Sequence, residues 1–317
     1  MLKKILYFPF QHLSFVVLLS MIIGLIVGNY FNDPFVRPLM PLSIFAMVLP
    51  TMIGFQWKEM ASTAHTKLFV IASIINFLII PSLAYLIGVV WLQGEPELFA
   101  GLALASLLPT SGMTISWTMV YKGNVSASIK ITAISLIMGA LITPVYLTIM
   151  FSEVIEANLM FLVMKVFLVI IVPMIIGDRI YRSLLKKYTI EEFNTKIKPM
   201  FPAISSWGLV VIIFVITSIN GKLLIAEIST LTKALMILIA FYFLNFLIST
   251  IIGKWLFNRA DSISLVYSTV LRNLSIAIGI ATISFGTKAA LILALAFVLQ
   301  IQFSTWYGKL TERLRIL

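Results

Sequence analysis

Two basic residues, Lys130 and Arg272, lie deep inside long apolar stretches. No Asp or Glu occurs in residues 98–152 or 262–311, so neither cation has a carboxylate nearby in the sequence. A charge at the centre of a bilayer costs at least about 2.5–3.5 kcal/mol on insertion scales, and an unpaired buried cation is unfavourable. We therefore expect carbonyls of a broken helix or an anionic substrate to meet each cation, unless the lysine loses its proton.

The two cations differ in depth. Arg272 is about ten residues from either end of its stretch, too deep for its side chain to reach an interface at 1.5 Å per residue. It is expected to replace an ion or contact an anion, or else to hold helix-end carbonyls. Lys130 lies six residues beyond Asn124, about 9 Å along a helix. Its side chain either snorkels to the interface or carries a coupled proton.

Other polar residues in these stretches are weaker candidates, because Ser and Thr often bond a carbonyl of their own helix. Gln300 and Gln302 point to opposite faces, so at most one of them faces the interior. The candidate substrate or ion-coupling residues are Arg272, Lys130, Asn273, Thr110, Ser111, Thr114, Ser128 and Thr132.

Enzyme chemistry is disfavoured by the residue inventory. The chain has 0 Cys and 2 His, which excludes a thiol nucleophile and a thiolate metal site. The stretches lack the clustered acids of a prenyl-transferring or metal-dependent membrane enzyme and the paired acids or Ser/His set of a protease. A retinal-type photoreceptor on Lys130 would need a carboxylate counter-ion. We expect no catalytic residues, no metal and no organic cofactor.

The elements that carry these residues are predicted to be membrane-spanning helices. Of the 317 residues, 61% are apolar and 11% charged, and the mean hydropathy is +1.07, whereas soluble domains are about 45–50% apolar and about 25% charged. A soluble enzyme, a disordered chain and a nucleic-acid binder are excluded together. Spanning helices need about 20 apolar residues, and ten stretches qualify, which predicts an all-α polytopic membrane protein. They are 12–30, 38–57, 67–92, 97–121, 125–150, 158–180, 199–220, 230–256, 262–285 and 288–309.

Ten spans place both termini on one side of the membrane. Most Lys and Arg residues outside the spans fall on that side, so the positive-inside rule predicts cytoplasmic termini in the cell (inner) membrane. The net charge of +11 is then explained by basic cytoplasmic loops rather than by a nucleic-acid partner. The partners expected are a lipid bilayer and a small organic anion.

The sequence contains an internal repeat. A basic residue followed by PxxP opens a span at 37–41 and again at 198–202, an offset of 161. Glycine turns at 122–127 and 285–290 precede the last span of each half, an offset of 163. We therefore predict two five-helix repeats, 1–157 and 158–317. Since five is odd, the second repeat is inverted, as in many secondary transporters. A polar linker at 178–198 falls close to the middle of the helix count, where a duplicated protein would carry its joint.

The fourth span contains a break. Pro109 removes a backbone donor and Gly112 loosens the chain, and the freed groups need partners within the membrane. The second half-helix would start near Ser111 and direct a partial positive charge at the midplane. The repeat offset places Arg272 opposite Pro109, so residues 270–275 are predicted to break the ninth span, although they contain no Pro or Gly.

Three elements resemble the bile acid:sodium symporter superfamily, which also includes arsenite transporters. They are Pro109, the run Met119-Val120-Tyr121-Lys122-Gly123-Asn124-Val125, and Arg272-Asn273-Leu274-Ser275. The resemblance implies a panel of helices 1, 2, 6 and 7 and a core of helices 3–5 and 8–10. Broken helices 4 and 9 would cross in the core, and the substrate would bind between panel and core.

The resemblance also implies where sodium would bind, and this chain departs from that pattern at several positions. Thr114, Ser128, Thr132 and Asn273 match polar positions that hold sodium in sodium-coupled members. Ile115 stands where those members have an asparagine, Ser268 is the nearest counterpart of a missing glutamate, and Arg272 occupies the neighbouring glutamine position. A cysteine used for arsenite is absent.

The sequence therefore predicts a secondary transporter of a small organic anion that works by alternating access. Lys130 and Arg272 would stand in place of the sodium sites, so that transport is sodium-independent or proton-coupled. The alternative is a sodium-coupled, bile-acid-like symporter. A metalloid exporter and a membrane-embedded enzyme rank lower.

Overall fold

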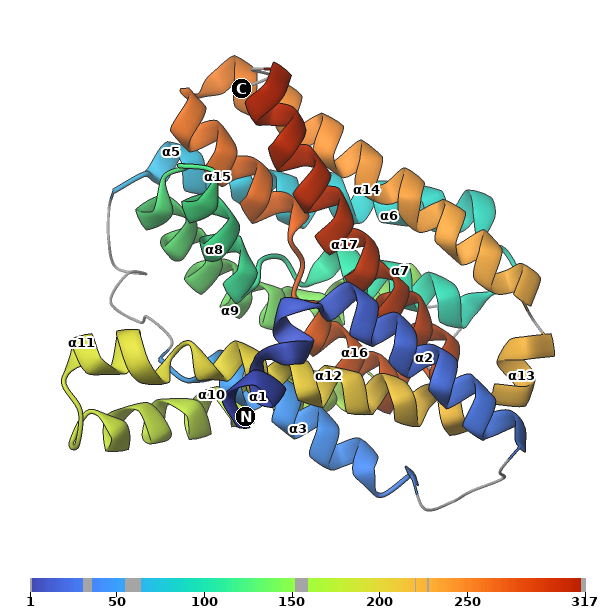
Figure 1. Ribbon diagram of the computed structural model, residues 1–317. Coiled ribbons are helices and arrows are strands. Elements are labelled where there is room, and N and C mark those ends of the chain that lie inside the picture. Colours follow the sequence, from blue (N-terminus) through green and yellow to red (C-terminus); the bar gives the residue numbers. More distant parts are fainter. Residues whose placement is uncertain are drawn as a thin grey trace.

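The computed structural model shows an assembly of packed helices (Figure 1). It describes residues 2–30, 36–54, 64–151, 159–219, 221–226 and 228–314. Within these ranges the regular structure is helical apart from one isolated β-bridge. The expected all-α class is confirmed.

The described helices include one or more for each predicted apolar stretch, together with short helices outside the stretches. In the first half these are α1 (Leu2–Gln11), α2 (Leu13–Tyr30), α3 (Leu39–Met52), α5 (Thr66–Ile74), the π-helical η2 (Ile75–Ile79), α6 (Ile80–Trp91), α7 (Pro96–Leu107), α8 (Gly112–Val120) and α9 (Val125–Phe151). In the second half they are α10 (Leu159–Leu184), α11 (Ile190–Glu192), the π-helical η3 (Phe193–Ile197), α12 (Met200–Ile219), α13 (Gly221–Ala226), α14 (Ile228–Leu256), α15 (Arg259–Val270), α16 (Leu274–Ser284) and α17 (Thr287–Leu314). Among the described residues, 6 helices are long and apolar enough to cross a membrane unbroken.

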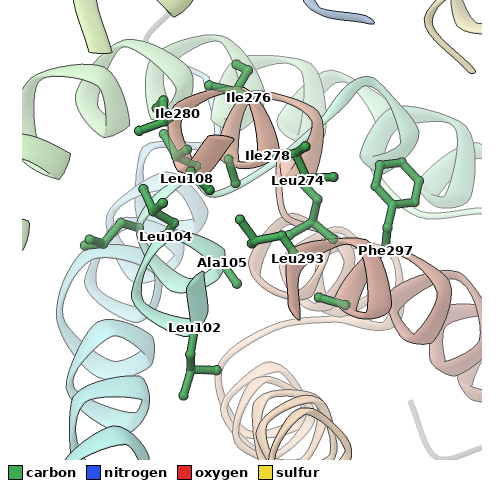
Figure 2. Close-up of a cluster of buried hydrophobic side chains, with 14 of the residues drawn as sticks. Leu102, Leu104, Ala105, Leu108, Leu274, Ile276, Ile278, Ile280, Leu293 and Phe297 are labelled. Atoms are coloured by element: carbon green, nitrogen blue, oxygen red, sulfur yellow. The ribbon is translucent and has the colours of Figure 1, made fainter. Parts of the chain in front are cut away.

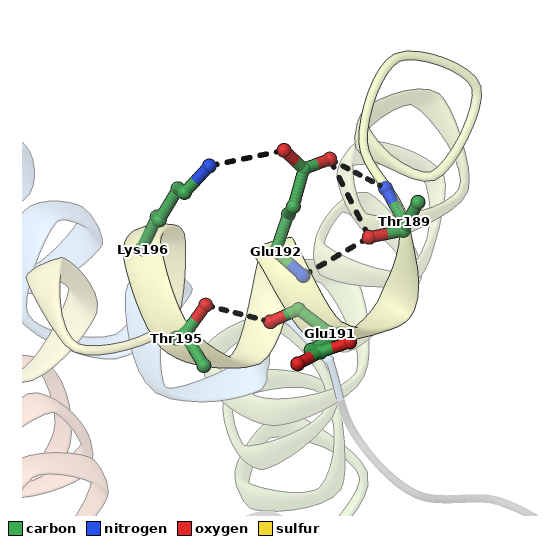
Figure 3. Close-up of polar contacts among 5 residues, drawn as sticks. All are labelled: Thr189, Glu191, Glu192, Thr195 and Lys196. Atoms are coloured by element: carbon green, nitrogen blue, oxygen red, sulfur yellow. Dashed lines mark hydrogen bonds and ion pairs between the residues drawn. The ribbon is translucent and has the colours of Figure 1, made fainter.

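The predicted linker at 178–198 is largely helical, which the hydropathy pattern did not indicate. α10 continues to Leu184, and α11 with η3 follows. The Thr189 hydroxyl accepts from the Glu192 amide at 3.1 Å, and the Glu192 carboxylate accepts from the Thr189 amide at 3.1 Å (Figure 3). This reciprocal cap starts a helix without any apolar stretch. Lys196 pairs with Glu192 at 3.0 Å, and its hydrogen bond, more than that of Thr189, lowers the pKa of Glu192.

The helices pack in two groups. In one, α12 lies against α2 and α3, α10 lies against α3, and α1 lies against α12. A Cβ at Gly28 of α2 would lie 2.1 Å from the Ser218 carbonyl oxygen of α12, so a glycine is what permits this close approach. In the other group α14 packs on α15 and α17, α7 packs on α17 and α6, and α9 packs on α7 and α8.

The groups meet where α3 and α10 contact α16, α2 and α12 contact α17, and α10 contacts α9. Buried side chains from α7, α16 and α17 form one apolar cluster beside this contact, including Leu104, Leu108, Ile278 and Leu293 (Figure 2). Apolar side chains thus pack beside the breaks in the fourth and ninth stretches.

Both predicted breaks are present, and they touch. α7 ends at Leu107 and α15 at Val270, and the short segments that follow form an antiparallel bridge between Pro109 and Arg272. The Asn273 amide donates to the Leu108 carbonyl at 2.8 Å. Because that bond joins the residue before Pro109 to the residue after Arg272, it does not need the N–H that proline lacks.

Candidate functional site at the helix crossing

Arg272 is completely buried at the bridge, with an exposed fraction of 0%. Its Nη1 donates to the Ser106 carbonyl in the last turn of α7 at 3.2 Å. Its Nε and Nη2 have no hydrogen-bond partner among the described residues. A guanidinium offers five N–H donors, so most of its donor capacity is unused, and no carboxylate in the described part of the chain pairs with its charge.

The backbone of Arg272 is held by Gln300 of α17. The Gln300 Oε1 accepts from the Arg272 amide at 2.7 Å, and the Gln300 Nε2 donates to the Arg272 carbonyl at 3.2 Å. The Tyr242 hydroxyl also donates to the Gln300 Oε1 at 3.3 Å. The sequence placed at most one of Gln300 and Gln302 in the interior, and the structure selects Gln300, which is 0% exposed.

The carbonyls at the end of α15 are met by two buried amides. The Asn76 Nδ2 of η2 donates to the Ser268 carbonyl at 3.0 Å, and the Asn245 Nδ2 of α14 donates to the Thr269 carbonyl at 3.3 Å. Sequence reasoning missed both asparagines. Both could have been identified from the sequence as amide side chains in the middle of an otherwise apolar span, where an amide needs a hydrogen-bond partner.

The carbonyls at the end of α7 are bonded by different groups from those at the end of α15. Arg272 takes the Ser106 carbonyl, and the Thr143 hydroxyl donates to the Leu107 carbonyl at 3.4 Å. The C-terminus of a helix carries a partial negative charge of about half an electron. Arg272 therefore places a full positive charge at the negative C-terminal end of α7. The corresponding end of α15 has the neutral amides of Asn76 and Asn245 as donors.

Four predicted candidates lie in or directly after the two breaks. Thr110 has a φ of 64° and donates to the Pro109 carbonyl at 2.7 Å. The Thr114 hydroxyl accepts from the Ser111 amide at 3.3 Å at the start of α8, and the Asn273 Oδ1 accepts from the Ile276 amide at 3.3 Å at the start of α16. These side chains bond the backbone within and directly after the breaks, and their expected role in binding a substrate or an ion stays a prediction.

Ser128 and Thr132 lie on α9, beside the crossing. The Ser128 hydroxyl is 2.9 Å from the Thr118 hydroxyl and accepts from Ser268 at 3.5 Å, which joins α8, α9 and α15. The Thr132 carbonyl is 3.5 Å from the Thr110 hydroxyl. The Thr132 hydroxyl is buried without a partner in the described residues.

Lys130 is buried but makes its contacts elsewhere. Its Nζ donates to the Ala64 carbonyl, just before α5, at 2.6 Å and lies 5.6 Å from the centre of the Phe69 ring. Both contacts are near the N-terminal end of α9, which begins directly after Asn124. The side chain therefore has the geometry of the snorkelling alternative, and none of its recorded contacts is with the crossing.

We predict that Gln300 is needed to hold the broken ninth helix in place. Gln300→Leu removes both bonds to the Arg272 backbone and the acceptor of the Tyr242 hydroxyl, so three buried groups lose a partner at about 1–3 kcal/mol each. The purified variant should unfold at a clearly lower temperature than the parent. Gln302→Leu is the matched control, because Gln302 is half-buried on the same helix, and it should unfold near the parent temperature. Equal unfolding temperatures for Gln300→Leu and the parent would contradict this role.

Comparison with known proteins adds a family and several relatives. A family model described as "Sodium Bile acid symporter family" matches residues 41–227. Uncharacterized protein YbaS of Bacillus subtilis is 20% identical over 258 residues, covering 80% of this chain and 81% of the relative. Sodium/bile acid cotransporter 7-A of Xenopus laevis is 24% identical, covering 77% of this chain and 72% of the relative. Arsenical-resistance protein Acr3 of Corynebacterium glutamicum is 23% identical, covering 78% of this chain and 70% of the relative.

Proposed function

We infer the function from a family premise: this chain belongs to the sodium bile acid symporter family and is a multi-pass membrane transporter. We propose that it carries a small organic anion by alternating access. In this proposal Arg272 is a resident cation that replaces coupled sodium at the crossing.

One observation carries the proposal. The Arg272 guanidinium is 0% exposed, and within the described chain it has no carboxylate partner and bonds only one helix-end carbonyl. Leaving a buried charge unpaired is strongly unfavourable, so an arginine there needs a compensating role. Its positive field in low-dielectric surroundings favours an anion nearby and disfavours a second cation.

We further propose the ten-span inverted-repeat architecture. The bridge supports it, because Pro109 and Arg272 are equivalent under the same 163-residue offset that relates the two glycine turns. An antiparallel pair of equivalent residues is what a two-fold axis through the crossing would produce.

A second pair of contacts supports the same symmetry. Asp261, in the first turn of α15, accepts from the Asn124 side chain before α9 at 2.7 Å. Glu97, in the first turn of α7, accepts from the Lys288 amide at the start of α17 at 3.0 Å. In each case an acid in the first turn of a broken helix accepts a hydrogen bond from a residue at the start of the last helix of the other half, or directly before it.

The two packing groups support the division into panel and core. The panel would be α2, α3, α10 and α12, and the core would be the remaining long helices with the crossing. The boundary between repeats, 157/158, lies outside the described residues. We propose the cell (inner) membrane with cytoplasmic termini, on the Lys and Arg bias of the loops.

The alternative is sodium-coupled transport of an organic anion, which the name of the Xenopus laevis relative suggests. The inward hydroxyls of Thr114, Ser128 and Thr132 would favour it, whereas Arg272 and Ile115 argue against it. The name of the Corynebacterium glutamicum relative suggests arsenic resistance, but the chain has 0 Cys to supply a soft ligand.

Uptake into proteoliposomes tests the proposal. A panel of carboxylates and sulfonates is offered to purified protein with and without gradients of sodium, pH and membrane potential. We expect saturable uptake of at least one anion without sodium, and empty liposomes give the background. Uptake of cationic or neutral solutes alone, or strict dependence of every substrate on sodium, would exclude the proposal.

A further inference from the structure

The segment that joins α10 to α12, residues 178–198, forms a hairpin with exposed apolar side chains beside basic ones. In Figure 1 the end of α10 and the short α11 lie at the left edge of the molecule, beyond the other helices. Tyr188 is 41% exposed and Ile190 is 62% exposed, and Lys186 and Lys187 directly precede Tyr188. Single exposed apolar residues are ordinary, but an aromatic and an aliphatic side chain next to two lysines is a composition typical of membrane interfaces.

Hydrogen bonds hold the tip of the hairpin in a defined shape. The Leu184 carbonyl accepts from the Lys187 and Tyr188 amides, each at 2.9 Å. The reciprocal cap of Thr189 and Glu192 then begins α11 (Figure 3). The exposed side chains are therefore carried on an ordered turn.

A buried ring anchors the hairpin to the helices behind it. Phe193 is 1% exposed, and its ring packs edge-to-face on Tyr181 of α10 with the ring centres 4.8 Å apart. The Phe193 ring centre is also 6.1 Å from that of Phe201 of α12. A Cβ at Gly54, just after α3, would lie 3.0 Å from the Phe193 ring. One apolar side chain of the hairpin is thus buried in the protein, while Ile190, three residues earlier, stays outside.

The tip of the hairpin lies at the depth of the lipid headgroups. α10 ends at Leu184, four residues beyond the limit of 180 expected for its span, which is about 6 Å along a helix. The headgroup layer of one leaflet is about 5–7 Å thick, since a bilayer of about 40–45 Å has a hydrocarbon core of about 30 Å. Side chains at the tip can therefore reach both the headgroups and the ends of the acyl chains.

The charge of the hairpin suits an anionic surface. It contains six basic and three acidic residues. Arg182 pairs with Asp178 at 2.8 Å, and Lys196 pairs with Glu192 at 3.0 Å. Four basic residues have no ion pair with a carboxylate in the described ranges: Arg179, Lys186, Lys187 and Lys198. Burial lowers the pKa of Lys198, and a phosphate beside it would favour its charged form.

We propose that the hairpin docks on the membrane surface and binds acidic phospholipids. Tyr188 and Ile190 insert between the headgroups, and Lys186 and Lys187 bind the lipid phosphates. On the proposed topology this surface is the cytoplasmic leaflet, whose negative potential attracts basic segments next to a spanning helix. The contact lies outside the helix crossing, so it does not depend on which solute the protein carries.

A fluorescent label at Ile190→Cys tests the contact. The chain has 0 Cys, so an environment-sensitive maleimide labels only the introduced thiol. The protein is placed in nanodiscs of phosphatidylcholine, or of phosphatidylcholine mixed equally with phosphatidylglycerol, each with a spin-labelled lipid as quencher. We expect blue-shifted, strongly quenched emission in the mixture and weaker quenching in phosphatidylcholine alone. Thr195→Cys, an exposed polar position on η3, is the matched control and should give water-like emission in both lipids.

Charge variants test the role of the lysines. One lysine near an anionic surface strengthens binding about fivefold. Lys186→Ser with Lys187→Ser should therefore lower the ratio of docked to undocked hairpin about thirtyfold and reduce quenching in the mixture to the phosphatidylcholine level. Lys222→Ser with Lys233→Ser removes the same charge from exposed positions elsewhere and should leave quenching unchanged. Salt at about 1 M should also weaken the contact, because the screening length falls to about 3 Å.

Two results would overturn the proposal. Water-like emission of the Ile190 label in both lipids would show that the tip faces solvent, as a docking surface for a soluble protein would. Equal quenching in both lipids, unchanged by the lysine variant, would show that acidic headgroups play no part. Tyr188→Cys repeats the measurement at a second position if Ile190→Cys does not fold. None of these readouts requires anion uptake, so their failure is distinct from failure of the proposed transport.

Discussion

Arg272→Ala should reduce anion transport by more than about a hundredfold, a loss of about 2.7 kcal/mol, while the protein remains folded. The guanidinium makes one hydrogen bond, to the Ser106 carbonyl, and carries a charge that no described carboxylate balances. Its removal relieves an unfavourable buried charge but costs one bond and leaves a cavity where the buried side chain was packed, so the variant should unfold at a lower temperature than the parent yet remain folded at the assay temperature. The positive field at the crossing disappears entirely.

Three further variants identify which property of the side chain matters. Arg272→Lys keeps the charge but loses the planar fork, and should rescue transport poorly. Arg272→Gln retains a donor for Ser106 without the charge, and should be as inactive as Arg272→Ala. Lys130→Ala is the matched removal of another buried cation. It should be milder because Lys130 contacts Ala64 and Phe69 rather than the crossing.

The measurements are initial uptake rates at low substrate concentration and the thermal unfolding of each purified variant. Near-normal transport by Arg272→Gln would show that Arg272 only holds the end of α7. A shift in the pH profile of Lys130→Ala would instead assign a coupled proton to that lysine.

Replacing external sodium with choline should leave the transport rate unchanged. Sodium at the polar positions of α8 and α9 would lie close to the Arg272 guanidinium. Two unit charges about 5 Å apart repel by about 3 kcal/mol at an effective dielectric constant of about 20, which weakens binding more than about a hundredfold. Uptake measured over a range of sodium concentrations at constant ionic strength checks this expectation. Saturable activation by millimolar sodium would refute it.

A gain-of-function variant sharpens the sodium experiment. Ser268→Glu with Arg272→Gln removes the fixed cation and adds a carboxylate beside Ser128, which Ser268 already contacts. If Arg272 is what replaces sodium, this double variant should acquire sodium-dependent transport or sodium-dependent thermal stabilisation. Arg272→Gln alone is its control.

Much of the fold could be predicted because spanning helices follow from composition alone. In a bilayer every backbone group must be satisfied within the segment, so an apolar stretch of sufficient length has to be helical. α2, α9 and α12 therefore lie within a few residues of their predicted limits. The break at Pro109 was equally visible, since proline cannot continue the helical hydrogen-bond pattern.

The second break was predicted only through the repeat, because residues 270–275 contain no proline or glycine. The structure supplies the reason it exists there: Gln300 and the Leu108 carbonyl satisfy the backbone of Arg272 and Asn273. Asn76 and Asn245 then satisfy the end of α15. These donors come from residues far away in the sequence, and no local pattern links them to the break.

The sequence by itself thus determined which segments are apolar helices, which cations have no local counter-charge and where one helix must break. Hydropathy and proline geometry act within a single segment, so a single segment reveals them. Tertiary structure decided that Lys130 contacts the loop before α5 while Arg272 stays at the crossing, and that Gln300 rather than Gln302 faces inward. It also decided that α16 packs on α3 and α10, whereas α8 packs on α9 and α15. Those outcomes depend on which helices lie side by side, and packing between distant segments leaves no signature in the residues of either one.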